Sequence, residues 1–339
     1  MSILTSDPSL GTTSTIGKYF GVVSTVPSLI GTTWLYLLFL LHPWQSPLDW
    51  SSLAANNPIA QPIQGLVLIA VAISIAVVTH PLQFVIVQLM EGYWGTSTAG
   101  LALAYRRALV QARRFDRALR LFSKVNPQTR PREEPLPPGS TRAERDARAR
   151  QALMQALTFS ASSAEVASFP STEASVLPTR LGNVLRRYEA RAGQSIGLPI
   201  LNWATFIGMV ADARHTAYVQ DQRQGLDLAV RMTAVSLLCA AVSTVALWPH
   251  GLWVLLAVLP YAAAWLSYRG ALAAAHAYGK AFEAWLYLNR FTLYEQLHLA
   301  TPKTSNDEQE LGAQLEEMLG GAGRSDVEYD HRSEKRSED

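Results

Sequence analysis

The sequence predicts an all-α integral membrane protein with four transmembrane helices, which form two hairpins, and with an α-helical cytoplasmic domain between and after them. Charged residues make up only 17% of the 339 residues, below the share of about 25% that is usual in soluble domains. The uncharged residues are concentrated in apolar stretches, and basic residues gather between these stretches. The single cysteine, Cys239, excludes a disulfide scaffold, and its apolar surroundings predict a small buried side chain.

The first hairpin is expected at residues 20–94, after a cytoplasmic N-terminus at 1–19. Residues 20–41 and 65–90 contain no Asp, Glu, Lys or Arg. A helix rises about 1.5 Å per residue, so about 20 residues cross a hydrocarbon core of about 30 Å. Both stretches are therefore long enough to span a membrane, and the first is too long for a cleaved signal peptide.

The second hairpin is expected at residues 229–268. The segment between Arg231 and Arg269 contains no charged side chain, but the run Trp248-Pro249-His250-Gly251 interrupts it. Proline and glycine this close together break a helix, and the two arginines can reach lipid headgroups. We therefore expect two short spans joined by a tight turn, at residues 232–248 and 252–268.

The basic residues set the expected orientation. The connecting segments 42–64 and 248–251 contain no Lys or Arg, whereas residues 95–228 contain 19 of them against 11 Asp and Glu. Cytoplasmic segments of membrane proteins carry the excess of Lys and Arg. The region 95–228 and both termini are therefore expected in the cytoplasm, with the bilayer as the first partner of this multi-pass protein.

The cytoplasmic domain at 95–228 is expected to be helical and basic. Within it, residues 101–125 carry apolar side chains at steps of three and four (Leu101, Tyr105, Ala108, Ala112, Phe115, Leu119 and Phe122), which predicts an amphipathic helix. Its arginines can contact anionic lipid headgroups or lie on a solvated face, and both interpretations stay open. Nucleic acid is not expected as a partner, because no binding motif accompanies the charge. The candidate headgroup contacts are Arg106, Arg107, Arg113, Arg114, Arg117 and Arg120.

A proline-rich linker at 126–140 divides this domain. Thr141 and Glu144 then have the spacing of a capping box, which predicts a helix to about Leu157 and an irregular stretch at 158–172. Another helix is expected between Pro178 and Gly193, with an apolar stripe formed by Leu181, Val184, Leu185 and Tyr188.

Residues 192–211 are also uncharged and could form a fifth span. Gly193, Gly197 and Pro199 interrupt their first half. A packed or interfacial helix is therefore the preferred interpretation. The helices of the second hairpin are expected to continue into the cytoplasm, the last one through residues 269–300.

Residues 301–339 form an acidic tail with 5 Lys and Arg against 11 Asp and Glu. Ser305 to Glu308 can cap a short helix, and the remainder is expected to be largely disordered. The tail can dock on the basic middle region or stay solvated, and the sequence leaves both open. The apolar face of the short helix consists of Leu311, Leu315, Met318 and Leu319.

A second kind of signal comes from particular strings of residues. Phe169-Pro170, Val176-Leu177, the string PTRLGNVLR at 178–186, Glu189 and Tyr278-Gly279 resemble a family of uncharacterised bacterial multi-spanning membrane proteins. The resemblance implies kinship and a bacterial plasma membrane, but no activity. The family-like segment contributes Pro178, Thr179, Arg180, Leu181, Gly182, Asn183 and Arg186 as candidate residues.

Motifs for catalysis are absent from the sequence. It contains no P-loop, HExxH, GxSxG or paired CxxC string, and its histidines do not fall at metal-ligand spacing. We therefore expect no enzyme activity, no cofactor and no metal site.

The second apolar stretch contains a polar break formed by Thr79, His80, Pro81 and Gln83. Pro81 removes an amide donor and is expected to free the carbonyl near Val77. Polar groups at membrane depth face a bundle interior or a water-filled path. The break can therefore line a pore, or His80 can bond a neighbouring helix in a packed bundle.

Two functions follow from these patterns. The first is a homo-oligomeric channel, and its two-plus-two arrangement of spans looks like that of bestrophin-type channels, although no motif of that family is present. The alternative is a membrane-tethered scaffold or effector whose cytoplasmic helical domain binds partners.

Overall fold

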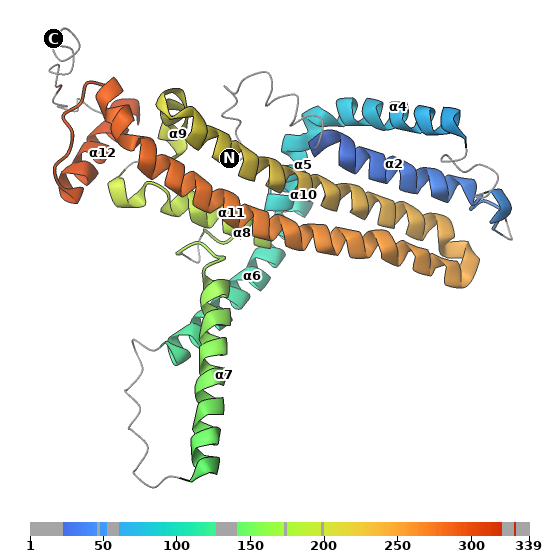
Figure 1. The fold of residues 1–339 in the computed structure, drawn as a ribbon, viewed down its shortest axis with the longest axis horizontal. Coiled ribbons are helices and arrows are strands. Elements are labelled where there is room, and N and C mark those ends of the chain that lie inside the picture. The colour runs from blue at the N-terminus through green and yellow to red at the C-terminus, as the bar shows by residue number, and fades with distance from the viewer. Residues whose placement is uncertain are drawn as a thin grey trace. The chain divides into compact units, whose positions relative to one another are not determined.

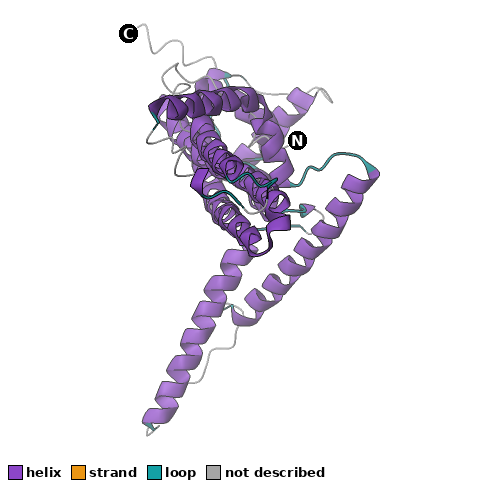
Figure 2. Ribbon diagram, turned by 90° about the vertical axis from the view of Figure 1, so that its right-hand side faces the viewer, coloured by secondary structure: helices purple, strands orange, loops and turns teal. Residues whose placement is uncertain are grey.

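The computed structural model describes residues 23–45, 48–52, 61–126, 141–172, 175–197, 200–320 and 329. Within these residues all regular elements are helices, apart from an isolated antiparallel bridge between Leu299 and Tyr329 (Figure 2). The all-α class is therefore confirmed. The expected N-terminus at 1–19, the linker beyond Asn126 and nearly all of the tail after Gly320 lie outside the described residues.

The chain divides into two compact units. Unit 1 contains residues 1–90 and 191–339, and unit 2 contains residues 91–190. Residues 191–228, which we expected in the cytoplasmic domain, belong to unit 1. The helix Ala213–Leu247 continues into the second hairpin, and the helix Ile200–Val210 packs on the last helix of that hairpin.

The first half of unit 1 contains two apolar helices. Helix α2 spans Thr25–Leu40 and packs against α4, which spans Pro62–Thr79. A short 3-10 helix, η3 (His80–Leu82), then leads into α5 (Gln83–Glu91). The second expected stretch is thus one helical segment with a break near its end.

The second half of unit 1 is a long helical hairpin. Helix α10 (Ala213–Leu247) and helix α11 (Val258–Gln296) lie side by side along their length (Figure 1). The 3-10 helix η6 (Trp248–Ala257) connects them, and its backbone leaves helical geometry at His250 and Gly251, where Gly251 has a φ of +62°. The predicted turn is confirmed, and α11 begins later than expected because η6 continues to Ala257.

The core of unit 1 combines small and aromatic side chains. Small side chains let helix backbones approach closely, and the buried alanines of α11 serve this role beside α10. Cys239 is buried, as predicted.

Helix α9 (Ile200–Val210) packs on α11 within unit 1, and its side chains Trp203 and Ile207 are fully buried. Eleven residues rise only about 16 Å, so α9 is too short to span, which agrees with the packed interpretation.

Two helical segments of unit 1 are long and apolar enough to cross a membrane, namely Pro62–Glu91 and Ala213–Gln296, and α2 is a shorter apolar helix. In the first segment only 17% of the most apolar stretch is buried, and Leu66 and Val78 are more than 70% exposed. A core helix of a soluble protein buries its apolar side chains. Helix α4 therefore differs from such a core helix in leaving most of its apolar side chains exposed.

The last helix of unit 1, α12, spans Ser305–Gly320. Its capping box lies one residue earlier than predicted, because the Asp307 amide donates to Thr304 Oγ1 at 3.2 Å and the Thr304 amide donates to Asp307 Oδ2 at 3.0 Å. Leu315 is buried, whereas Met318 of the predicted apolar face is exposed.

Unit 2 contains α6 (Thr98–Val125), α7 (Arg142–Val166) and most of α8 (Arg180–Arg191). The capping box of Thr141 and Glu144 is confirmed at the start of α7. The irregular stretch expected at 158–172 is wrong for its first half, because α7 continues to Val166. Alanine favours helix, and the Thr158 hydroxyl donates to the Met154 carbonyl at 2.7 Å within the helix.

Aromatic side chains of α6 pack against α7 and against the residues that follow α7 in the sequence. The rings of Phe115 and Phe169 lie 5.2 Å apart, and those of Phe122 and Phe159 lie 5.4 Å apart. Other members of the predicted apolar stripe, Leu101, Tyr105 and Leu119, remain exposed. The stripe is therefore wider than the face that α7 covers.

Candidate functional site

The polar break of the second apolar stretch forms where α4 ends at Thr79. Pro81 has no amide hydrogen, so the α-helical hydrogen bond to the residue four before it cannot form. The His80 amide donates to the Val77 carbonyl instead. The prediction of a free carbonyl near Val77 is therefore wrong, because one 3-10 turn satisfies that group.

Side chains from α10 and from the start of α2 contact this break. The Arg231 guanidinium donates through Nη2 to the Thr79 carbonyl at 3.3 Å. Ser24 Oγ lies 3.4 Å from His80 Nδ1. Both polar atoms of the Gln83 amide are buried, and neither has a hydrogen-bond partner among the residues that the structure describes. Thr79 and His80 thus meet side chains from α10 and from the start of α2 at one junction in unit 1, and Gln83 begins α5 one turn after Thr79.

A row of charges on α10, of which Asp227 and Arg231 are buried, leads to this junction. Arg223, Asp227 and Arg231 follow one another at steps of four, so they share one helix face. Arg223 Nε lies 3.7 Å from Asp227 Oδ2, and Arg231 is only 2% exposed. Sequence reasoning treated Arg231 as a flanking residue and missed this row, although the spacing of the three residues was the signal for it.

Close packing fixes α2 beside the charge-free part of α10. A Cβ added to Gly31 would lie 2.5 Å from the Val235 side chain. Trp34 Nε1 donates to Ser243 Oγ at 2.9 Å. Small residues allow close helix packing and interhelical hydrogen bonds add to it, so the Trp34 and Ser243 side chains serve the packing of α2 on α10.

The arginines predicted to contact headgroups fall on two sides of α6. At 100° per residue, four of them and Lys124 lie within about 60° of one another around the helix. We call this exposed set the basic stripe. Arg114 lies about 100° away and forms an ion pair with Glu165 of α7. The basic stripe consists of Arg106, Arg113, Arg117, Arg120 and Lys124.

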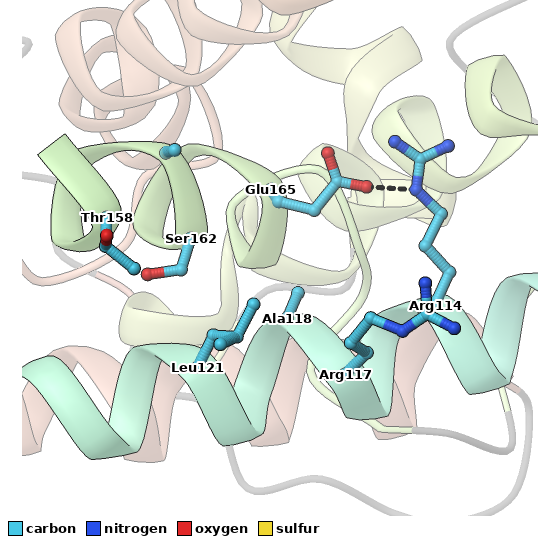
Figure 3. A pocket seen from close by; sticks show the side chains of 8 residues that line it. Arg114, Arg117, Ala118, Leu121, Thr158, Ser162 and Glu165 are labelled. Atoms are coloured by element: carbon cyan, nitrogen blue, oxygen red, sulfur yellow. Dashed lines mark ion pairs between the residues drawn. The ribbon is translucent and has the colours of Figure 1, made fainter.

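A pocket of about 260 Å³ lies between α6 and α7 (Figure 3). Glu165 pairs there with Arg114 and also with Arg180 at 3.5 Å, so its charge is compensated. Thr158 and Ser162 donate their hydroxyl hydrogens to carbonyls of α7. The volume lies below the usual range of about 300–1,000 Å³ for ligand pockets. These contacts fit a cross-link between α6, α7 and α8 better than a ligand site.

The family-like segment forms a junction with the end of α5 inside unit 2. Thr179 Oγ1 donates to the Glu91 carbonyl at 2.8 Å, and the Cα of Gly182 lies against the same carbonyl, where an added Cβ would come within 2.0 Å. Asn183 closes the preceding loop, since its Oδ1 accepts from the Leu177 amide at 2.6 Å. Pro178 lies against Gly92, which has a φ of +106°. The specific residues of the segment therefore have structural roles.

Charged groups gather beside this junction. Glu91 is 1% exposed, and Arg186 Nη1 lies 3.7 Å from Glu189 Oε2. Burial raises the pKa of the Tyr93 hydroxyl, and the carboxylates of Glu189 and Glu91 raise this pKa further, while Arg186 lowers it. No pattern in the sequence assigned Glu91 to a site.

The comparisons with known proteins add no further site residues. No family model, curated protein or solved structure matches the chain. Across the described ranges, no group of three or more His, Cys, Asp or Glu side chains is arranged to hold a metal ion. The junction at Thr79 and the basic stripe are therefore the two candidate functional features.

Proposed function

We propose that the chain is a four-span membrane protein that tethers a basic helical domain to the cytoplasmic face of a bacterial plasma membrane and acts there as a scaffold. The observation that carries this proposal is the exposure of α4, of which only 17% of the most apolar stretch is buried. A soluble protein does not expose a continuous apolar helix of this length. Lipid around α4 accounts for this exposure.

Contacts at both ends of the helices support a common apolar layer. At one end Arg231 contacts Thr79, and at the other His250 Nε2 lies 2.7 Å from the Pro43 carbonyl. The helical path along α4, and along α10 from Arg231 to Leu247, is about 24–27 Å long. This length approaches the hydrocarbon thickness of about 30 Å, and the layer then contains α2, α4 and the charge-free parts of α10 and α11.

Aromatic side chains gather at the end of this layer near the hairpin turns. The rings of Trp50 and Trp253 lie 4.6 Å apart, and Trp44 and Trp248 are exposed. Tryptophan is enriched at membrane interfaces. Their positions support an outer interface at this end and a cytoplasmic location for the basic region.

The basic stripe supports an anionic partner for α6. Each basic residue close to an anionic membrane contributes about 1 kcal/mol of attraction. Arg120 also pairs with Asp116 at 2.7 Å, so the attraction comes mainly from the other four residues of the stripe. The apolar side chains Leu109 and Val110 beside the stripe are also exposed, which favours contact with lipid over simple solvation. We therefore assign anionic lipid headgroups as the first partner of the scaffold.

Hydrogen exchange of the full chain in nanodiscs tests this assignment. We expect slower exchange of the α6 amides in discs that contain phosphatidylglycerol than in discs of phosphatidylcholine, and we expect salt to remove the difference. Replacing the four arginines of the stripe by glutamine should abolish the difference in exchange between the two kinds of disc. The matched control replaces Arg142, Arg145, Arg148 and Arg150 of α7, with the same loss of charge. Equal exchange in both lipids would contradict the lipid contact.

A homo-oligomeric channel is the second candidate. The peripheral position of α4 favours it, because α4 packs mainly on α2 and leaves its other faces exposed for a neighbouring copy. Native mass spectrometry of the detergent-solubilised chain and planar-bilayer recordings test this idea together. A closed ring with a conductance that changes in His80→Ala would support a channel, whereas a monomer without conductance would exclude it.

A further inference from the structure

We propose that unit 1 binds a phosphate group at the junction of α4 and α5, with the guanidinium of Arg231 and the amide of Gln83 as its main contacts. The phosphate can belong to a lipid headgroup or be a free inorganic ion. The lipid source rests on the membrane placement proposed above, but the chemistry of the site does not. The site is separate from the basic stripe, which lies in unit 2.

The charge of the junction favours an anion. Arginine keeps its charge at all physiological pH values and matches the geometry of phosphate oxygens. Arg231 brings this charge to a position that is 2% exposed and 3.3 Å from the Thr79 carbonyl. The row on α10 contains two arginines and one aspartate, Asp227, so the sum of its formal charges is positive.

Gln83 provides the second, independent observation. It begins α5, one turn after Thr79, and both polar atoms of its amide are buried without a hydrogen-bond partner in the described part of the chain. Buried polar groups in native proteins are nearly always hydrogen-bonded, because an unsatisfied group is costly. The amide NH₂ can donate to a phosphate oxygen, and the Ser24 hydroxyl and the His80 ring lie at the same junction.

The position of the junction suits a headgroup. The charge-free part of α10 begins directly after Arg231, so the junction lies where the apolar layer meets the polar region. Lipid phosphates occupy this level of a bilayer. Arg269 flanks the same charge-free hairpin on α11, but it is exposed and its guanidinium lies 5.5 Å from the centre of the Trp265 ring.

The test measures thermal stabilisation of the purified full chain in a neutral detergent. One arm adds phosphatidylglycerol, a second adds sodium phosphate, and a third adds sodium chloride at the same ionic strength. The variants are Arg231→Gln, Gln83→Leu and, as the matched control, Arg269→Gln. Leucine is similar in shape to glutamine, so Gln83→Leu removes only the buried amide. This variant therefore still tests the proposal if Arg231→Gln does not fold.

We expect phosphatidylglycerol or sodium phosphate to raise the melting temperature of the wild type and of Arg269→Gln. The apparent affinity for the stabilising compound should be about tenfold lower, or lower still, in Gln83→Leu than in the wild type. Stabilisation by the lipid alone assigns a headgroup, and stabilisation by both assigns a site for phosphate in general. An effect equal to that of sodium chloride, or one that Gln83→Leu leaves unchanged, would overturn the proposal.

Discussion

Two glycines, Gly92 and Gly182, allow the family-like segment to lie directly against the end of α5. At Gly182 the backbone of Glu91 occupies the place of a side chain, and at Gly92 the positive φ excludes most other residues. The Asn183 side chain accepts a hydrogen bond from the Leu177 amide, and the Thr179 hydroxyl donates one to the Glu91 carbonyl. The string is therefore explained by close approach and loop closure rather than by catalysis.

Gly182→Ala should destabilise unit 2 by about 1–3 kcal/mol, the usual cost of forcing an extra methyl into a packed site. The control is Gly225→Ala in α10, where nothing lies within 4 Å of the added Cβ, and it should stabilise by up to about 1 kcal/mol. Chemical unfolding followed by circular dichroism measures both. Equal effects of the two substitutions would contradict the close contact with Glu91.

Tyr294 on α11 links stability to pH. Burial raises the pKa of its hydroxyl well above the usual value, and the Glu308 carboxylate, which accepts its hydrogen bond at 3.3 Å, raises the pKa further. The folded state therefore holds this proton more tightly than the unfolded state, so stability falls as the pH rises above about 10. Tyr294→Phe should flatten this decline in unfolding experiments between pH 8 and 11, whereas Tyr218→Phe, at an exposed position, should not.

Elements show how far sequence patterns reach. The break at Pro81, the turn at Gly251 and the cap at Thr141 were predictable, because each depends on local backbone chemistry. The end of α7 was not, since Ser and Ala are compatible with both helix and loop. The contact of Arg231 with Thr79 joins residues far apart in sequence, and no local pattern specifies which helices meet.

Helix α4 gives the clearest prediction for a single element. Leu66→Arg places a charge on a face that is 71% exposed. In water this change should be nearly neutral. A charge at the centre of a bilayer costs about 2.5–3.5 kcal/mol, and Leu66 lies about 7 Å from the middle of α4, so the cost there should be somewhat smaller. We expect a lower yield of inserted, folded protein by size-exclusion chromatography. Leu153→Arg on α7, at 60% exposure, is the control and should change the yield little.

The whole molecule combines an apolar bundle with basic and acidic segments. Unit 1 contains the apolar helices, and α12 is fixed to α11 in the same unit by the ion pair of Arg290 Nε with Glu308 Oε1 at 2.7 Å. Helix α12 also packs on the 3-10 helix η5 (Gln194–Ile196) and on Gly197. These residues belong to unit 1 and to the basic region at 95–228, so the first part of the tail contacts that region at its unit 1 end. The central claim is that four helices cross the membrane with the basic domain on the cytoplasmic side.

Cysteine labelling in intact cells tests this claim most directly. Cys239 is the single cysteine, so Cys239→Ser provides the background for one new cysteine at Gln45, Leu252, Arg117 or Glu310, all of which are exposed. A membrane-impermeant maleimide should label positions 45 and 252 without lysis, and positions 117 and 310 only after the membrane is permeabilised. Labelling of all four positions from the same side would contradict the two transmembrane hairpins.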